Sequence, residues 1–245
     1  MKTLVIIPSR LSATRLPGKP LLKINGLSII SHVFKKATDA NIGEVYVATE
    51  DQEIFDDVRQ NGGQAIMTSK NHKTGTDRIF EALNKIGKSD IELIMNLQGD
   101  EPLMNLDDIR NLHNQMILTK SKFGTSASVI SDKSLYKDPN VVKVFTKEKL
   151  NISKFPEAQS FVRIFDSNRE NVYHHLGIYC YQLDTLQNFV SLNQSQNEIK
   201  NNLEQLRALD NNININVSLA KDSPIGVDTK KDFIAIKKIM EYKSK

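Results

Sequence analysis

The stretch TLVIIP, at residues 3 to 8, decides the fold, because it is a continuous apolar run of strand length that ends at a polar loop. Similar apolar runs follow at EVYVAT (44 to 49), QAIMT (64 to 68) and ELIMNLQ (92 to 98). Helical periodicity between them predicts two buried helix faces, made by Ile29, Ile30, Val33, Phe34 and Ala37 and by Ile79, Phe80, Leu83 and Ile86. Continuous apolar strands joined by helices are typical of a parallel sheet covered on both faces. The first half therefore predicts a doubly wound α/β fold.

The second half is less regular. Apolar or alternating patterns predict strands at 125 to 130, 140 to 146, 174 to 182 and 215 to 220. A closing amphipathic helix is predicted over 229 to 242, and the weakly periodic residues 147 to 172 are expected to form an exposed excursion. The pattern shows no repeat and no linker, so we expect a single domain over residues 1 to 245.

Composition excludes several classes of protein. With 245 residues, 39% hydrophobic and 25% charged, the chain has the composition of an ordinary globular protein. Its longest apolar runs fall far short of the roughly 20 residues of a membrane helix, and the N-terminal run ends at Pro8 and Arg10 without a cleavage site, so neither a membrane span nor a signal peptide is expected. The net charge of +4 is dispersed, which disfavours a nucleic-acid partner. The single cysteine, Cys180, lies in an apolar run and is expected to be a buried thiol in a cytoplasmic protein.

The loop after the first strand, SATRLPGKP at 12 to 20, gathers positive charge. Together with Arg10 just upstream, it places Arg15 and Lys19 on backbone whose prolines disfavour a helix and whose Gly18 permits close approach of the chain. It is not a P-loop, because Ala13 and Pro20 stand where that motif needs glycine and a hydroxyl residue, and no G-x-G-x-x-G follows the strand. The loop is either a polyphosphate site or a solvated surface loop.

Carboxylates follow another strand of the predicted sheet. Asp100 and Glu101 come directly after the strand at 92 to 98 and are followed by Pro102. Because ligands bind beyond the carboxyl ends of such strands, this loop and the loop at 12 to 20 are expected on one rim. The pair is either a magnesium ligand or a polar turn that caps the next helix. Asp228 precedes the closing helix and, from the sequence alone, is best interpreted as its N-cap.

Three other segments have a plain structural interpretation. KTGTDR at 73 to 78 is a helix N-terminal capping signal. In LEQLR at 203 to 207, Glu204 and Arg207 are spaced for an ion pair on a solvated helix. In HHLGIYCY, a period of two predicts one strand face with His175, Gly177 and Tyr179 and another with His174, Leu176, Ile178 and Cys180. Adjacent histidines on opposite faces make a zinc pair unlikely by geometry.

Five collinear stretches carry a family resemblance. PSRLSATRLPGKPL at 8 to 21 closely resembles the signature loop of the nucleotide-sugar cytidylyltransferases, and most closely that of the 3-deoxy-manno-octulosonate (Kdo) cytidylyltransferases. The other four are KTGTDR, NLQGDEPL at 96 to 103, HLGIYCY at 175 to 181, and LEQLR followed by GVDT at 226 to 229. The resemblance covers almost the whole chain.

The resemblance implies a Rossmann-like, nucleotide-diphospho-sugar transferase fold in which residues of roughly 130 to 185 serve sugar binding and dimerisation. It implies transfer of CMP from CTP to Kdo, for lipopolysaccharide or capsule synthesis, by a Mg²⁺-dependent cytoplasmic homodimer. The implied catalytic residues are Arg10, Arg15, Lys19 and Asp100, and the implied metal ligands are Asp100 and Asp228. The implied nucleotide contacts are Pro8, Ser9, Arg10, Lys19, Thr74, Arg78 and Gln98. The implied sugar contacts are Gln98, Lys154, His175, Tyr179, Glu204 and Gln205.

One stretch departs from the family pattern. The family usually carries Ser-Arg before an Ile-Pro-Trp-like turn, and here NISKFPEA at 151 to 158 puts Lys154 in place of the arginine expected to meet the sugar carboxylate. Lysine neutralises a carboxylate without gripping it bidentately. An amino-Kdo or another nonulosonic acid is therefore an alternative acceptor, and a non-catalytic nucleotide-binding module is a remoter alternative.

Overall fold

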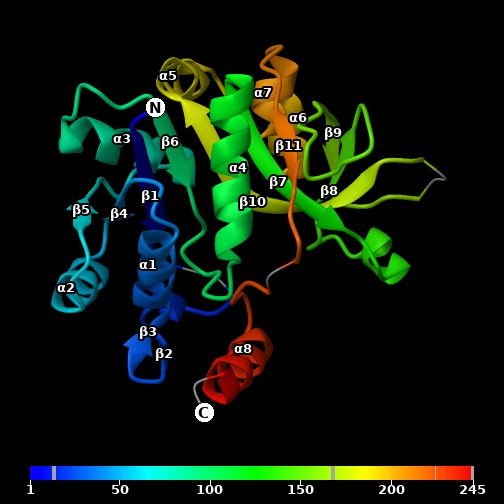
Figure 1. Ribbon diagram of the computed structural model, residues 1–245. Helices are drawn as coiled ribbons and strands as arrows, with labels where there is room; N and C mark the ends of the chain where they lie inside the picture. Colours follow the sequence, from blue (N-terminus) through cyan, green and yellow to red (C-terminus); the bar gives the residue numbers. More distant parts are fainter. Residues whose placement is uncertain (13–14, 167–168, 224, 244–245) are drawn as a thin grey trace. The chain divides into compact units, whose positions relative to one another are not determined.

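The computed structural model describes residues 1–12, 15–166, 169–223 and 225–243 of the chain (Figure 1). Ala13, one of the two positions that argued against a P-loop, lies outside the described residues. The chain forms two compact units: the first holds residues 2–91, 95–106 and 224–245, and the second holds Met1, residues 92–94 and residues 107–223. The single domain expected over residues 1 to 245 stays a prediction.

The first unit contains the predicted series of alternating strands and helices. Its strands are β1 (Thr3–Ser9), β4 (Glu44–Thr49), β5 (Ala65–Met67) and the last two residues of β6 (Leu93–Asn96), with a small hairpin of β2 (Lys23–Ile24) and β3 (Leu27–Ser28). Its helices are α1 (Ile29–Asp39), α2 (Gln52–Gln60), α3 (Gly75–Ile86) and α8 (Lys230–Lys243), and a 3₁₀ turn, η1, covers Lys19–Leu21. The predicted strand boundaries agree with the structure to within two residues.

Strand order in this unit explains where a ligand can bind. The order is β6-β1-β4-β5, with β4 parallel to both β1 and β5. The chain moves outward from β1 to β5 and then returns past β1 to β6. Because crossovers between parallel strands are right-handed, this return places α3 on the face opposite α1 and α2, which confirms the doubly wound prediction. The direction of winding reverses between β1 and β6, and ligands of such sheets bind at this switch point.

The core of the first unit holds the loops of this switch point in place. Strand β1 is buried on both faces, since Leu4 to Ile7 have no exposed surface. A second cluster, of Ile24, Ile29, Val227 and Ile236, packs against Leu16, Leu22, Leu103, Phe233 and Met240. These residues come from the loop after β1, from β2 and the start of α1, from the loop after β6, and from α8 and the segment before it. One apolar cluster therefore fixes the three segments that carry Lys19, Asp100 and Asp228.

The second unit is built on antiparallel pairs. Strand β10 (Val172–Gln182) pairs antiparallel with β7 (Phe123–Val129) and β8 (Lys143–Thr146), β8 pairs antiparallel with β9 (Ala158–Val162), and β11 (Asn216–Leu219) is parallel to β7. The unit also contains the 3₁₀ turn η2 (Lys133–Lys137) and the helices α4 (Leu106–Thr119), α5 (Leu183–Ser191), α6 (Gln196–Asn201) and α7 (Leu206–Asp210).

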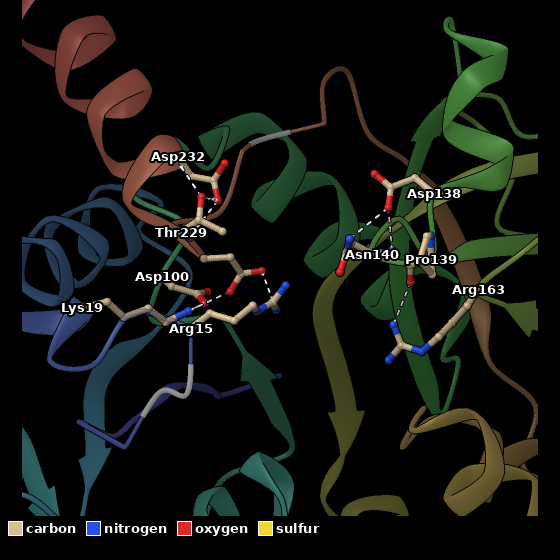
Figure 2. Close-up of polar contacts among 10 residues, drawn as sticks. Arg15, Lys19, Asp100, Asp138, Pro139, Asn140, Arg163, Thr229 and Asp232 are labelled. Atoms are coloured by element: carbon tan, nitrogen blue, oxygen red, sulfur yellow. Dashed lines mark hydrogen bonds and ion pairs between the residues drawn. The ribbon is translucent and has the colours of Figure 1, made fainter.

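Two expectations for the second unit are wrong in part. The stretch 147 to 172 is not simply an exposed excursion, because it contains β9 and buries Leu150, Phe161 and Phe165. Arg163 at its centre donates to the carbonyl oxygen of Pro139 at 3.0 Å (Figure 2). It also donates to the carbonyl oxygen of Asn201 at 2.7 Å, a contact between residues distant in sequence. Strict alternation in β10 fails only at Gly177 and Ile178, where the pairing with β7 shifts register, whereas His175 and Tyr179 lie on one face as predicted.

No helix among the described residues is long and apolar enough to cross a membrane.

Candidate active site

A pocket of about 360 Å³ opens in the first unit at the switch point of its sheet. Four segments line it: the loop after β1, the loop before α3 with the start of that helix, the loop after β6 and the segment before α8. The lining residues are Pro8, Ser9, Arg10, Ser12, Arg15, Lys19, Pro20, His72, Lys73, Thr74, Gly75, Arg78, Gln98, Gly99, Asp100 and Asp228. The expectation that the loops after the first strand and after the strand at 92 to 98 share one rim is therefore confirmed.

Two carboxylates converge on one ammonium group in this pocket. The Nζ atom of Lys19 lies 2.5 Å from Oδ2 of Asp100 and 3.0 Å from Oδ1 of Asp228 (Figure 2). Arg15 donates to the other oxygen of Asp228 at 3.0 Å. Burial alone would lower the pKa of Lys19, but the charges and hydrogen bonds of Asp100 and Asp228 outweigh burial and raise it. The site is thus a compact cluster of two cations and two anions.

Backbone contacts bring these residues together. The N–H of Val227 donates to the carbonyl oxygen of Asp100 at 2.8 Å, which places Asp228 beside Asp100. A Cβ on Gly99 would lie 3.0 Å from the carbonyl oxygen of Pro8, so glycine is needed for the loop after β6 to lie against the end of β1. The fold therefore positions the two carboxylates from segments distant in sequence.

The loop that carries Lys19 differs from expectation in two respects. Gly18 has a φ of +71°, and nothing lies within 4 Å of the position that its Cβ would take. The left-handed backbone, and not the predicted close approach, therefore requires glycine here. The prolines also do not exclude helical backbone: Lys19–Leu21 is a 3₁₀ turn with Pro20 in its first turn, where proline loses no hydrogen bond.

Asp228 does not cap the closing helix, so the interpretation as an N-cap is wrong. Thr229 takes that role: its Oγ1 accepts from the N–H of Asp232 at 3.2 Å, and Asp232 accepts in return from the N–H and hydroxyl of Thr229, each at 2.8 Å (Figure 2). Asp228 is left to pair with Lys19 and Arg15.

The start of α3 has the predicted cap. Oγ1 of Thr74 accepts from the N–H of Asp77 at 3.2 Å. Arg78 lines the pocket but is itself buried, and its guanidinium donates to Oγ1 of Thr68 at 2.6 Å and forms an ion pair with Glu50. The sequence analysis missed Glu50, whose one signal is its position directly after the strand at 44 to 49. Arg78 is thus held by the protein on one side of the pocket.

Glu101 behaves differently from its neighbour. Its carboxyl group is buried, and Oε2 makes no hydrogen bond with any described residue. Burial, followed by the charges of Asp100 and Asp228, raises the pKa of Glu101 to about 8, against the opposing effect of Lys19. Glu101 is therefore mainly protonated at neutral pH, and only Asp100 of the acidic pair is charged in the pocket.

The other predicted sugar contacts lie in the second unit. The ring of His175 is buried and its centroid lies 5.5 Å from that of the partly buried Tyr179, and Nε2 of His175 lies 3.0 Å from Oγ1 of Thr125. Burial lowers the pKa of His175 to about 3, so its imidazole is neutral. Burial and then the charge of Glu204 raise the pKa of Tyr179, which places Glu204 close to the phenol.

Lys154 and Arg207 have partners of their own in the second unit. Lys154 is exposed and lies 2.6 Å from Oε2 of Glu148. Arg207 is buried and pairs bidentately with Glu198 at 2.8 and 2.6 Å, while Glu204 lies 3.9 Å away. The expected ion pair of Glu204 and Arg207 is therefore present, but the expectation that it lies on a solvated helix is wrong, because Arg207 is buried. The predicted sugar contact Gln205 is buried just before α7.

The sequence analysis also did not name His72 and Lys73 as site residues, although both line the pocket and Lys73 is the first residue of the recognised motif at 73 to 78. No group of three or more histidine, cysteine or acidic side chains within metal-binding reach occurs among the described residues. A metal in the pocket would therefore depend on two carboxylates and on oxygens from a ligand, which is the usual arrangement for Mg²⁺ in phosphate-binding sites.

Comparisons with known proteins agree with this site. A cytidylyltransferase family model matches residues 4–216. The 3-deoxy-manno-octulosonate cytidylyltransferases of Nitrobacter hamburgensis and Thermodesulfovibrio yellowstonii are each 40% identical to it, over 98% of this chain and 93% and 98% of their own lengths.

Solved structures extend the comparison. A CMP:2-keto-3-deoxy-manno-octonic acid synthetase complexed with CTP has a TM-score of 0.90 and 34% identity, covering 99% of this chain and 100% of that one. A 4-diphosphocytidyl-2C-methyl-D-erythritol synthase from Anaerococcus prevotii has a TM-score of 0.65 at 14% identity, covers 98% of each chain, and shares the fold alone.

Proposed function

The chain belongs to the 3-deoxy-manno-octulosonate cytidylyltransferases, and we propose that it transfers CMP from CTP to the anomeric hydroxyl of Kdo, releasing pyrophosphate. The oxygen of the C2 hydroxyl attacks the α-phosphorus, the bond from that phosphorus to the bridging oxygen breaks, and the hydroxyl proton is lost to solvent. The observation that carries the proposal is the cluster of Lys19, Asp100 and Asp228 in a pocket lined by the loop before α3. No protein nucleophile is needed for this reaction, so positioning and charge stabilisation do the work.

Three cations of the loop after β1 are suited to the triphosphate. Arg10, Arg15 and Lys19 line the same pocket, and guanidinium groups match phosphate oxygens while the ammonium supplies a point charge. Lys19 is the least exposed of the side chains in its cluster, which strengthens its electrostatic effect on the leaving pyrophosphate. Pro8, Ser9, Thr74, Arg78 and Gln98 complete the proposed nucleotide contacts.

Asp100 and Asp228 have the donor set and arrangement for Mg²⁺. Their oxygens already converge on a single cation, the ammonium of Lys19, and carboxylate oxygens are ligands that Mg²⁺ prefers. When bound, the metal would neutralise phosphate charge that develops as pyrophosphate leaves. Lys19 and Arg15 would then be released from the two carboxylates to bind phosphate.

The sugar acid is proposed to contact Gln98, Lys154, His175, Tyr179, Glu204 and Gln205. The neutral imidazole of His175 and the un-ionised phenol of Tyr179 suit hydrogen bonds to hydroxyl groups. Lys154 would meet the carboxylate of the sugar. Because Lys154 stands where the family carries arginine, an amino-Kdo or another nonulosonic acid is the second candidate acceptor.

The proposal is tested by measuring pyrophosphate release from CTP with Mg²⁺ and a panel of acceptors: Kdo, amino-Kdo and other nonulosonic acids. We expect kcat/KM to be highest for Kdo. A higher kcat/KM for amino-Kdo or another acid would identify that acid as the acceptor in place of Kdo. Binding of CTP with no pyrophosphate release for any acceptor would favour a non-catalytic nucleotide-binding module. The cytoplasmic homodimer expected from the family stays a prediction.

A further inference from the structure

One wall of the pocket is formed by the segment that precedes α3, and this segment has no helical or strand hydrogen bonding of its own. Residues 68 to 74 connect β5 to α3 without helix or strand, yet His72, Lys73 and Thr74 line the pocket. A segment of this kind keeps one conformation only where other groups form hydrogen bonds with its backbone and side chains. The contacts that fix it therefore also fix the shape of the nucleotide pocket.

Two side chains of α3, three residues apart and so on one face, reach back to this segment. Arg78 donates to the carbonyl oxygen of Ser69 at 3.3 Å, while Glu81 accepts from the N–H of the same residue at 2.9 Å. Both polar groups of the Ser69 backbone are thus bound to the helix.

Glu81 also binds the pocket-lining imidazole directly. Its Oε2 pairs with Nε2 of His72, and its Oε1 lies 2.7 Å from the ammonium of Lys85, which in turn donates to the carbonyl oxygen of Met67 at 2.8 Å. A carboxylate that accepts a hydrogen bond from Nε2 fixes the orientation of the imidazole ring. Burial would raise the pKa of Glu81, but bonds from Lys85, Ser69 and His72 lower it to about 2, so Glu81 stays ionised.

We propose that Glu81 is a positioning residue for the nucleotide: through His72 and the Ser69 backbone it holds the wall of the pocket in the shape that binds CTP. Glu81 does not line the pocket itself, so its effect on CTP passes through the residues that it holds. The proposal rests on the proposed function, since it assumes that the ligand of this pocket is CTP.

The test compares Glu81→Ala, Glu81→Gln, His72→Ala and the double variant Glu81→Ala/His72→Ala in the full chain. CTP affinity is measured by calorimetry, and KM for CTP and kcat by pyrophosphate release. Loss of a partly buried charged hydrogen-bond partner predicts an increase in Kd and KM of about tenfold for Glu81→Ala, with kcat at saturating CTP within about twofold of the wild type. Glu81→Gln, which keeps an acceptor oxygen, should recover part of the affinity.

Lys85→Met is the matched control, because it removes the ion pair on the far oxygen of Glu81 and leaves His72 and Ser69 bound. Lys85 is half exposed, so CTP affinity should change by no more than about twofold. Because Glu81 acts through His72, the double variant should lose little more CTP affinity than His72→Ala alone.

Three results would overturn the proposal. Glu81→Ala could bind CTP as tightly as the wild type, or Lys85→Met could lose as much CTP affinity as Glu81→Ala. The third is a double variant whose loss of CTP affinity equals the product of the two single losses. If the wild-type chain itself fails to bind CTP, the proposed function fails instead, so the two failures are distinguishable.

Discussion

Lys19 is the residue on which the chemistry of the pocket depends most. It reaches two carboxylates that belong to different loops, and it is the least exposed side chain of the cluster. Its position could be predicted from the loop motif, but its two partners could not, because nothing in the sequence says which distant carboxylates the fold brings to it. At Asp228 the sequence was misleading, since Asp228 and Thr229 are both residues that cap helices and only the folded chain distinguishes them.

Removing the ammonium of Lys19 should abolish CMP transfer. We expect Lys19→Ala to lower pyrophosphate release by at least about 100-fold, the scale observed when a group that stabilises transition-state charge is deleted. Circular dichroism should show an intact fold. Lys88→Ala, which breaks a surface ion pair with Glu44 outside the pocket, serves as the control and should keep its activity. Full activity of purified Lys19→Ala would contradict the assigned role.

Glu101 should make stability depend on pH. Its pKa is raised in the folded chain to about 8, above the ordinary value of 4.5, so the folded state favours the protonated form. This contribution is fully present below about pH 4.5 and is lost as pH rises through about 8. Urea unfolding without metal measures the free energy of unfolding of Glu101→Gln and of the wild type. The value for Glu101→Gln minus the value for the wild type should therefore increase from pH 5 to pH 9. Glu53→Gln, an exposed change on α2, should show no such trend, and a flat difference for Glu101→Gln would refute the burial of its charge.

At the scale of elements, periodicity predicted the regular parts and failed at the irregular ones. The main strands and helices of the first unit follow from apolar runs and a 3.6-residue period, because β1 and β4 are largely buried and helices such as α1 and α3 bury one face. Strand β9 was missed because its neighbours in 147 to 172 are loops and its burial depends on pairing with β8. The alternation of β10 correctly placed His175 and Tyr179 on one face, but it did not predict the interruption at Gly177 and Ile178, because a register shift depends on the partner strand.

The turn that presents Lys19 depends on left-handed backbone at Gly18. Because open space surrounds its Cβ position, Gly18→Ala should cost only the conformational energy, about 1 to 2 kcal/mol. Gly18→Asn should cost less, since asparagine tolerates this region better. Chemical denaturation measures both. Equal stability of all three chains would mean that the turn does not need a positive φ.

The buried pair of Arg78 and Glu50 connects the start of α3 to the end of β4. Glu50→Ala leaves an uncompensated buried guanidinium and should destabilise the protein by about 3 kcal/mol. Replacing both residues, in Arg78→Met/Glu50→Met, should cost clearly less than the two single changes added together. Additive losses in urea unfolding would show that the two side chains do not act as a pair.

At the scale of the molecule, the pocket carries its own counter-ion before any ligand arrives. In the proposed site Mg²⁺ would displace Lys19 from Asp100 and Asp228, and CTP phosphates would give Lys19 and Arg15 new partners, so we expect the metal and the nucleotide to bind cooperatively. Ligand at 100 times its Kd stabilises the folded chain by about 2.7 kcal/mol. The increase in Tm with Mg²⁺ and CTP together should exceed the sum of the two separate increases. If Mg²⁺ alone raised Tm as much as Mg²⁺ and CTP together, Lys19 would not compete with the metal.

The most direct measurement is the fate of the α-phosphorus. Incubating the purified chain with Mg²⁺, Kdo and CTP labelled at the α-phosphate should move the label into a sugar nucleotide, with one pyrophosphate released for each label transferred. The same incubation with Asp100→Ala should leave the label in CTP. Label that stays in CTP with the wild-type chain, under conditions in which calorimetry shows CTP to be bound, would contradict the account.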